Sequence, residues 1–146
     1  RDYIKLGKKQ GIENYFKQKP HAFSQFLWEE RKKQYGESLK LKTKYVFFDR
    51  ALHDVIGYLN YVQNPNKKWE KELNNYKYNL VFLLKPVFQI YIQDEDRMET
   101  FEEAVEVHKS LEKTYHQSKL KIIKLPFTTS QKRFDLILKN CANELS

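Results

Sequence analysis

The stretch that decides the predicted fold is Lys44-Tyr45-Val46-Phe47-Phe48-Asp49-Arg50, followed closely by His53-Asp54. A nearly unbroken apolar run ends there in an acid and a base. A strand with apolar residues on both faces lies in the middle of a parallel sheet that helices cover on each side. The sequence therefore predicts an α/β fold with a buried strand over 44–48.

The position of Asp49 and Arg50 suggests a binding site. In open α/β sheets, ligands bind just beyond the carboxyl ends of the strands. We therefore expect both side chains to project into that crevice, where a carboxylate can hold a magnesium-bound water and a guanidinium can grip phosphate. The pattern indicates phosphoryl chemistry.

Length and composition fit one domain. With 146 residues, of which 40% are hydrophobic, the chain can bury a core, and we expect a single domain over 1–146. No apolar run approaches the ~20 residues that span a bilayer, so we expect no membrane span and a cytoplasmic location. A single cysteine, Cys141, excludes an intramolecular disulfide and a multi-cysteine zinc site. We expect it to be a small buried or half-buried residue of the last helix rather than a nucleophile.

The net charge of +8 is unevenly distributed. Residues 1–44 hold 12 Lys and Arg against 5 Asp and Glu, whereas residues 45–146 hold 15 against 14. A basic half of this kind fits a binding module that docks on nucleic acid or anionic lipid. A solvated, lysine-rich helical surface explains the same charge equally well.

Apolar periodicity predicts helices that alternate with short strands. The predicted helices cover 1–10, the stretch from Pro20 to Gly36, and 52–62, 67–76, 101–115 and 130–143; the predicted strands cover 44–48, 80–84 and 120–125. Strands that alternate with helices of this length form a parallel sheet with helices on its faces. His108 lies on the apolar side of the helix over 101–115, where we expect it to be a core residue.

A series of segments, in order along nearly the whole chain, resembles the NadR-like AAA ATPases of the P-loop kinase-like group. These segments are Arg1-Asp2-Tyr3-Ile4, Phe23 to Arg31, Val46 to Arg50 with Asp54 and Tyr58, Tyr78 to Leu83, Pro86 with Ile90 to Arg97 and Phe101 to Ala104, and Leu125-Pro126 with Arg133. The resemblance implies a domain that binds ATP, or GTP, with Mg²⁺ as cofactor. It also implies either hydrolysis of the nucleotide or transfer of its γ-phosphoryl group to a small-molecule acceptor, such as a nucleoside.

The sequence departs from the family at its phosphate-binding loop. The family opens with a strand and a G-x-x-x-x-G-K-[ST] loop that cradles the nucleotide phosphates. No such pattern occurs in the 146 residues. We therefore expect a P-loop NTPase-like fold that lacks its first strand and P-loop, and we expect the chain alone to bind ATP poorly. The resemblance implies that residues 12–40 form the helical segment on the acceptor side and that residues 86–100 form a lid-like connection.

The resemblance assigns roles to three residues around the apolar stretch. Asp49 is the candidate catalytic residue, which would orient a magnesium-bound water or the acceptor hydroxyl; the alternative is an N-cap of the helix over 52–62. Arg50 would bind acceptor or product phosphate, or form a surface ion pair. Asp54 would hold an acceptor hydroxyl or Arg50, or serve as an ordinary first-turn acid.

Four further residues have counterparts in the family. Arg97 resembles the lid arginine that closes over the ATP phosphates, with an exposed arginine of a first helical turn as the alternative. Arg1 resembles a site-lining arginine. Pro126 and Phe127 follow the third strand, where related folds pass the adenine ring, although packing of a loop explains them equally well.

Overall fold

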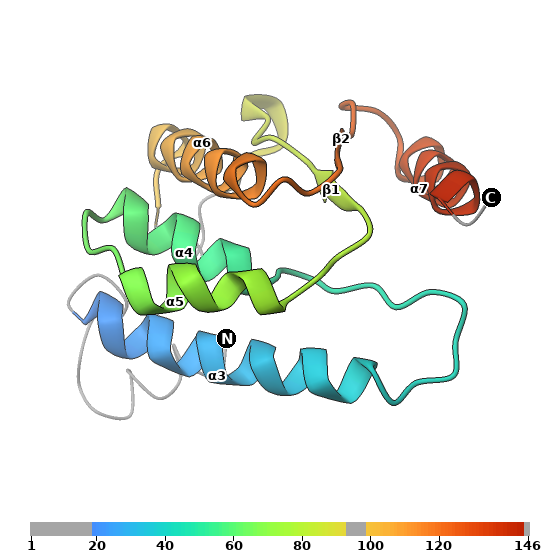
Figure 1. Cartoon of the computed structure of the whole chain (residues 1–146). Helices are drawn as coiled ribbons and strands as arrows, with labels where there is room; N and C mark the ends of the chain where they lie inside the picture. The colour runs from blue at the N-terminus through green and yellow to red at the C-terminus, as the bar shows by residue number, and fades with distance from the viewer. Residues whose placement is uncertain (1–18, 93–98, 145–146) are drawn as a thin grey trace, which may run out of the picture.

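The computed structural model describes residues 19–92 and 99–144, which form helices and short strands in alternation (Figure 1). The helices are α3 (Pro20–Ser38), α4 (Leu52–Tyr61), α5 (Lys67–Glu72), α6 (Phe101–Gln117) and α7 (Ser130–Glu144), the strands are β1 (Val81–Leu83) and β2 (Ile122–Lys124), and short 3-10 turns cover Leu73–Asn75 (η1) and Phe88–Ile90 (η2). The predicted α/β class is confirmed, and most predicted elements are present with shifted ends.

The strands β1 and β2 pair in parallel, with α6 as the connection between them. Val81 lies opposite Ile122, and Leu83 lies opposite Lys124. A parallel pair needs a crossover of this length, since a tight hairpin reverses the chain. The two strands and their connecting helix therefore form one βαβ unit, as the alternation in the sequence predicts.

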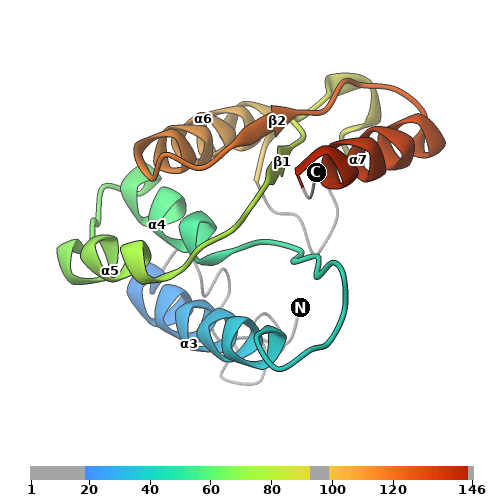
Figure 2. The same ribbon diagram turned by 45° about the vertical axis from the view of Figure 1, so that its right-hand side comes forward.

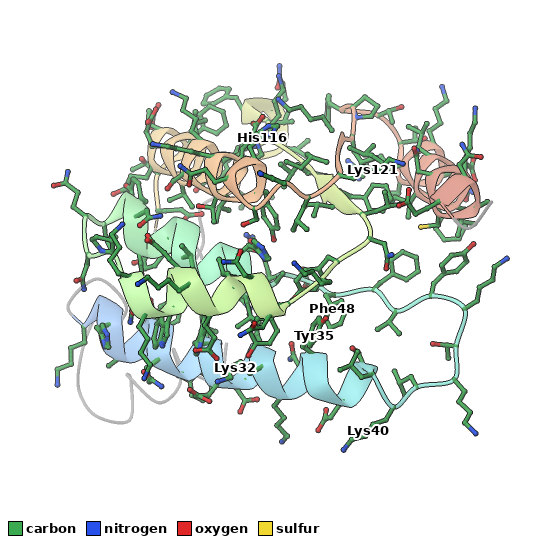
Figure 3. All side chains as sticks on the ribbon, viewed as in Figure 1. Lys32, Tyr35, Lys40, Phe48, His116 and Lys121 are labelled. Atoms are coloured by element: carbon green, nitrogen blue, oxygen red, sulfur yellow. The ribbon has the colours of Figure 1, made fainter. Side chains whose placement is uncertain are left out.

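The predicted buried strand over 44–48 is wrong for the described part of the chain. This segment has no strand partner there, and Val46 and Phe47 are 39% and 60% exposed. The physical reason is that a strand is held by hydrogen bonds to a neighbouring strand, and the described sheet pairs β1 and β2 only with each other. Phe48 packs instead against Tyr35 of α3, at 6.2 Å between ring centroids (Figure 3).

Two predicted helix ends also differ from the structure. Gly36 does not end α3, which continues to Ser38, because the hydroxyl of Ser38 donates to the carbonyl of Tyr35 and ties down the last turn. The helix predicted over 67–76 is α5 followed by η1, a tightening that is common where a helix ends.

The main hydrophobic core lies between α3, α4 and α5. Leu52, Val55, Ile56 and Leu59 recur at helical spacing on α4 and are at most 2% exposed. They pack against two tryptophans and Leu73, the tryptophans being Trp28 of α3 and Trp69 of α5. Figures 1 and 2 show that α4 lies between α3 and α6, which makes it the central helix of the fold.

Helix α6 begins at a complete capping box and packs closely on α4. The hydroxyl of Thr100 accepts from the N–H of Glu103 at 3.1 Å, and the Glu103 carboxylate accepts from the N–H of Thr100 at 2.8 Å. Further along α6, the hydroxyl of Ser110 donates to the carbonyl of Gly57 at 2.7 Å. The two helix backbones approach at Gly57 because this residue has no side chain.

We predict that Gly57→Ala destabilises the fold. The added Cβ would lie 2.7 Å from Cδ2 and 2.9 Å from Cα of Leu111, so α4 and α6 would have to separate. Overpacking of this kind costs about 1–3 kcal/mol. The measurement is the free energy of unfolding in urea.

Gly36→Ala is the matched control for this change. An added Cβ at Gly36 has nothing within 4 Å, so the change should be neutral or stabilise α3 by up to ~1 kcal/mol through helix propensity. Equal free energies of unfolding for the two variants would contradict the close approach of α4 and α6.

Candidate functional site

The candidate site is built around the turn of Asp49 and Arg50, which leads into α4. Both residues are exposed. Arg50 has a φ of 75°, in the left-handed region that residues other than glycine seldom adopt. Such backbone strain persists only where surrounding contacts hold it, and it concentrates at functional sites. The contacts that hold this turn come from α3, α4 and α6.

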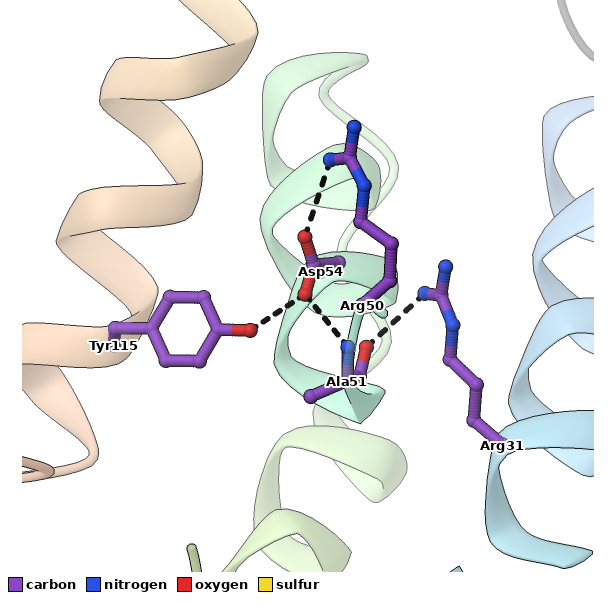
Figure 4. A network of polar contacts seen from close by, with 5 residues as sticks. All are labelled: Arg31, Arg50, Ala51, Asp54 and Tyr115. Atoms are coloured by element: carbon purple, nitrogen blue, oxygen red, sulfur yellow. Dashed lines mark hydrogen bonds and ion pairs between the residues drawn. The ribbon is translucent and has the colours of Figure 1, made fainter. Parts of the chain in front are cut away.

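The carboxylate of Asp54 is the centre of these contacts (Figure 4). Its Oδ2 accepts from the backbone N–H of Ala51 at 2.9 Å and from the hydroxyl of Tyr115 at 2.5 Å. Its Oδ1 accepts from the Arg50 guanidinium at 3.4 Å. Asp54 is therefore both the first-turn acid that caps α4 and the partner of Arg50.

The proposed alternative role of Asp49 as an N-cap is wrong. The N-cap position of α4 is Ala51, whose N–H is satisfied by Asp54. Asp49 lies two residues earlier, and its side chain makes no hydrogen bond or ion pair with any residue in 19–92 or 99–144. Its carboxylate is free to contact a ligand.

Arg31 of α3 was given no role in the site from the sequence. Its guanidinium donates from Nη1 to the carbonyl of Ala51 at 3.0 Å, so it holds the turn from the side opposite Tyr115 (Figure 4). Burial lowers the pKa of Arg31, and the negative charge of Asp54 opposes that shift. The sequence does contain a sign of this role. Arg31 is four residues from both Leu27 and Tyr35, which are half-buried, so it lies on the inner face of the helix.

Tyr115 is the last residue of the helix predicted over 101–115, and it is 5% exposed. Burial, followed by the charge of Asp54, raises the pKa of Tyr115 well above its ordinary value. The hydroxyl therefore keeps its proton and donates to Asp54. No pattern in the sequence shows this role, because the partner lies 61 residues away.

The turn lies beside β1. Ala51 is buried with Val81 and Tyr115 in a second small cluster. Burial lowers the pKa of His108 of α6, and the negative charge of Glu112 opposes that shift. The positive charges of Lys124, Lys85 and Arg50 add to the lowering of this pKa. Lys85 and Lys124 lie at the carboxyl ends of β1 and β2, where the topology of α/β proteins predicts a ligand.

The loop after β2 borders an open groove of about 590 Å³. Pro126 and Phe127 line one side of this groove, and α7 lines the other with Lys132, Asp135, Leu136 and Lys139. Phe127 is 59% exposed, so its ring is accessible to a planar ligand. The structure thus places the predicted base-binding loop in a concave surface, but Asp49 and Arg50 are not part of its lining.

Two of the predicted site residues lie outside the described residues. Arg1 and Arg97 lie outside the ranges 19–92 and 99–144. Within those ranges, no three His, Cys, Asp or Glu side chains form a group that could hold a metal ion. Also within them, no helix combines the length and the apolar character needed to cross a bilayer. Cys141 is buried as expected, which raises the pKa of its thiol.

Parallel strands joined by a helix, with cations at their carboxyl ends, define an α/β protein compatible with a P-loop-like fold. The chain belongs to the AAA domain family, whose sequence profile matches residues 1–133. Neither the curated proteins nor the solved structures contain a match to it. Membership in this family supports nucleotide binding and an NTPase or kinase-like function.

We predict that His53 makes the fold sensitive to acid. This residue is 1% exposed, and burial lowers its pKa from 6.5 to about 4, so the folded protein keeps the ring neutral. Between these two values the unfolded chain binds more protons, so the free energy of unfolding falls as the pH drops through this window. The loss is about 3 kcal/mol at most.

The measurement is the free energy of unfolding as a function of pH between 4 and 7. His53→Phe keeps the ring that stacks on Tyr115 at 5.0 Å, and it should flatten the slope. His116→Gln is the control, because that side chain is 61% exposed, and it should leave the slope unchanged. A slope that persists in His53→Phe would assign the acid sensitivity to other groups.

Proposed function

We propose that this chain forms the magnesium and acceptor side of an ATP-dependent NTPase or small-molecule kinase of the NadR-like type. The observation that carries the proposal is the Asp49-Arg50 turn, in which an exposed carboxylate and an exposed guanidinium are held by contacts from three helices. Phosphoryl transfer requires mainly positioning and electrostatic stabilisation, and such a turn supplies both.

Asp49 is suited to a water-mediated contact with magnesium. Mg²⁺ keeps several waters and binds through one or two carboxylates together with substrate phosphates. An exposed carboxylate without a described protein partner fits that requirement, and it could equally orient the acceptor hydroxyl. When bound, the ion would neutralise charge on the transferred phosphoryl group.

Arg50 and Asp54 have different parts in this proposal. The Arg50 side chain is 61% exposed and meets Asp54 at 3.4 Å, so it keeps donors for a phosphate group. Asp54 is only 12% exposed, and both its oxygens accept hydrogen bonds from the protein. It therefore positions Arg50 and the turn rather than holding an acceptor hydroxyl.

The nucleotide base and phosphates would be bound by other parts of the protein. The exposed ring of Phe127, in the groove beside α7, offers a face on which a base can stack. Arg97 remains the proposed lid arginine and Arg1 a proposed site-lining residue. The 146 residues contain no G-x-x-x-x-G-K-[ST] pattern, so the loop that would bind the nucleotide phosphates has no counterpart among them. A nucleoside-like acceptor follows from the resemblance to the NadR-like group.

We predict that Asp49→Asn abolishes magnesium-dependent nucleotide turnover. Removal of the charge should lower kcat by about 100-fold or more, because an aligned charged group is lost from the transition state. The fold should be unaffected, since Asp49 is exposed and has no described partner. The measurement is steady-state turnover of ATP and GTP with and without Mg²⁺, together with the melting temperature.

Glu37→Gln is the control for this experiment, because it removes another exposed carboxylate near the end of α3. It should leave both turnover and melting temperature unchanged. Full turnover by Asp49→Asn would show that the carboxylate has no catalytic role.

A further inference from the structure

We propose that Arg31 and Arg50 together form a binding site for the phosphate group of a phosphate monoester. This inference rests on the proposed function and extends it, because it adds a second arginine from a different helix and names the chemical group that the pair recognises. The ligand would be the phosphorylated acceptor or a related nucleoside monophosphate.

The first support is the local balance of charge. The negative charge of Asp54 raises the pKa of Arg31, and the positive charge of Arg50 lowers it. Both oxygens of Asp54 already accept hydrogen bonds, from Ala51, Tyr115 and Arg50. Among the described residues Arg50 forms an ion pair with Asp54, whereas Arg31 donates only to the neutral carbonyl of Ala51, so Arg31 is the charge that an anion would pair.

The second support is the unused hydrogen-bonding capacity of Arg31. A guanidinium has five N–H donors. Among the described residues, Arg31 donates one hydrogen bond, from Nη1 to the Ala51 carbonyl. Arg31 is half-buried, and a charged group that is removed from water is costly unless it is paired. A neutral carbonyl does not pair it, whereas a phosphate oxygen would.

The third support is the placement of the two side chains. Arg50 directly precedes Ala51, and Arg31 contacts the carbonyl of Ala51, so the two side chains approach the same turn from different elements. In Figure 4 Arg31 points to the carbonyl of Ala51, and Arg50 extends toward the carboxylate of Asp54. Each is close enough to influence the other electrostatically, and this repulsion would be relieved by an anion between them.

The wider field favours the same ligand. Arg50 and Lys85 both act on His108; Lys124 does so too, but it forms an ion pair with Glu112. Clustered charge of one sign raises the local concentration of the opposite ion. Arginine forks match the geometry of phosphate oxygens, and two forks from different helices suit a group with three terminal oxygens.

The test is calorimetric titration of the full-length protein with inorganic phosphate and, separately, with a nucleoside monophosphate. Arg31→Met and Arg50→Met should each weaken binding of both probes roughly 10- to 100-fold, as expected for loss of charge-assisted hydrogen bonds. Arg31→Lys keeps the charge without the fork and should give an intermediate loss. Lys33→Met removes an exposed charge from the same helix and should change nothing.

Further readouts separate binding from structure. Phosphate should raise the melting temperature of the wild type and of Lys33→Met, but not of Arg31→Met or Arg50→Met. If Arg31→Met does not fold, Arg50→Met decides, because its side chain is 61% exposed and is not needed for packing. Unchanged affinity for both probes in Arg50→Met, or in a folded Arg31→Met, would overturn the inference.

The outcomes also distinguish this inference from the proposed function. If Asp49→Asn loses turnover while Arg31→Met keeps its phosphate affinity, the proposed function is supported and the paired arginine site is rejected. If phosphate binding depends on both arginines but the protein has no nucleotide turnover, the paired arginine site is supported and the proposed function is rejected. Tighter binding of the monophosphate than of inorganic phosphate would identify the ester as the ligand.

Discussion

The position of the candidate site depends on one buried carboxylate. Asp54 accepts the N–H of Ala51, the hydroxyl of Tyr115 and the guanidinium of Arg50, and so it joins the start of α4, the inner face of α6 and the strained turn. Because the contacts come from different elements, the turn cannot relax without breaking the cap of the central helix. The left-handed backbone of Arg50 is thus sustained by the same hydrogen bonds that begin α4.

The other helices matter because they keep this carboxylate in place. Gly57 allows α4 and α6 to approach closely enough for Tyr115 to reach Asp54, and Arg31 of α3 binds the carbonyl of Ala51. Packing between helices therefore fixes a polar geometry that no single element contains. The exposed groups, Asp49 and the guanidinium of Arg50, are presented by a rigid support, as electrostatic catalysis requires.

The sequence was sufficient for the features that depend on local pattern. Helical periodicity predicts α4, α6 and α7 closely, and the apolar runs around Val81 and Ile122 predict the parallel strands. The run before Asp49 was misjudged, because burial of a strand depends on a partner edge that periodicity cannot reveal. The site could be predicted only in part: Asp49, Arg50 and Asp54 are close in sequence. Arg31 and Tyr115 reach it through tertiary contacts across 20 and 61 residues.

The stacked pair Trp28 and Trp69 has an optical consequence. These are the two tryptophans of the chain, and their rings lie almost parallel, at 4.9 Å between centroids and 5° between planes. Both are buried, so their fluorescence and their coupled ultraviolet circular dichroism report on the contact between α3 and α5. This signal would change when the two helices separate, and it would not change when the Asp49 turn opens locally. The arrangement allows global unfolding and loosening of the site to be measured independently in the unlabelled protein.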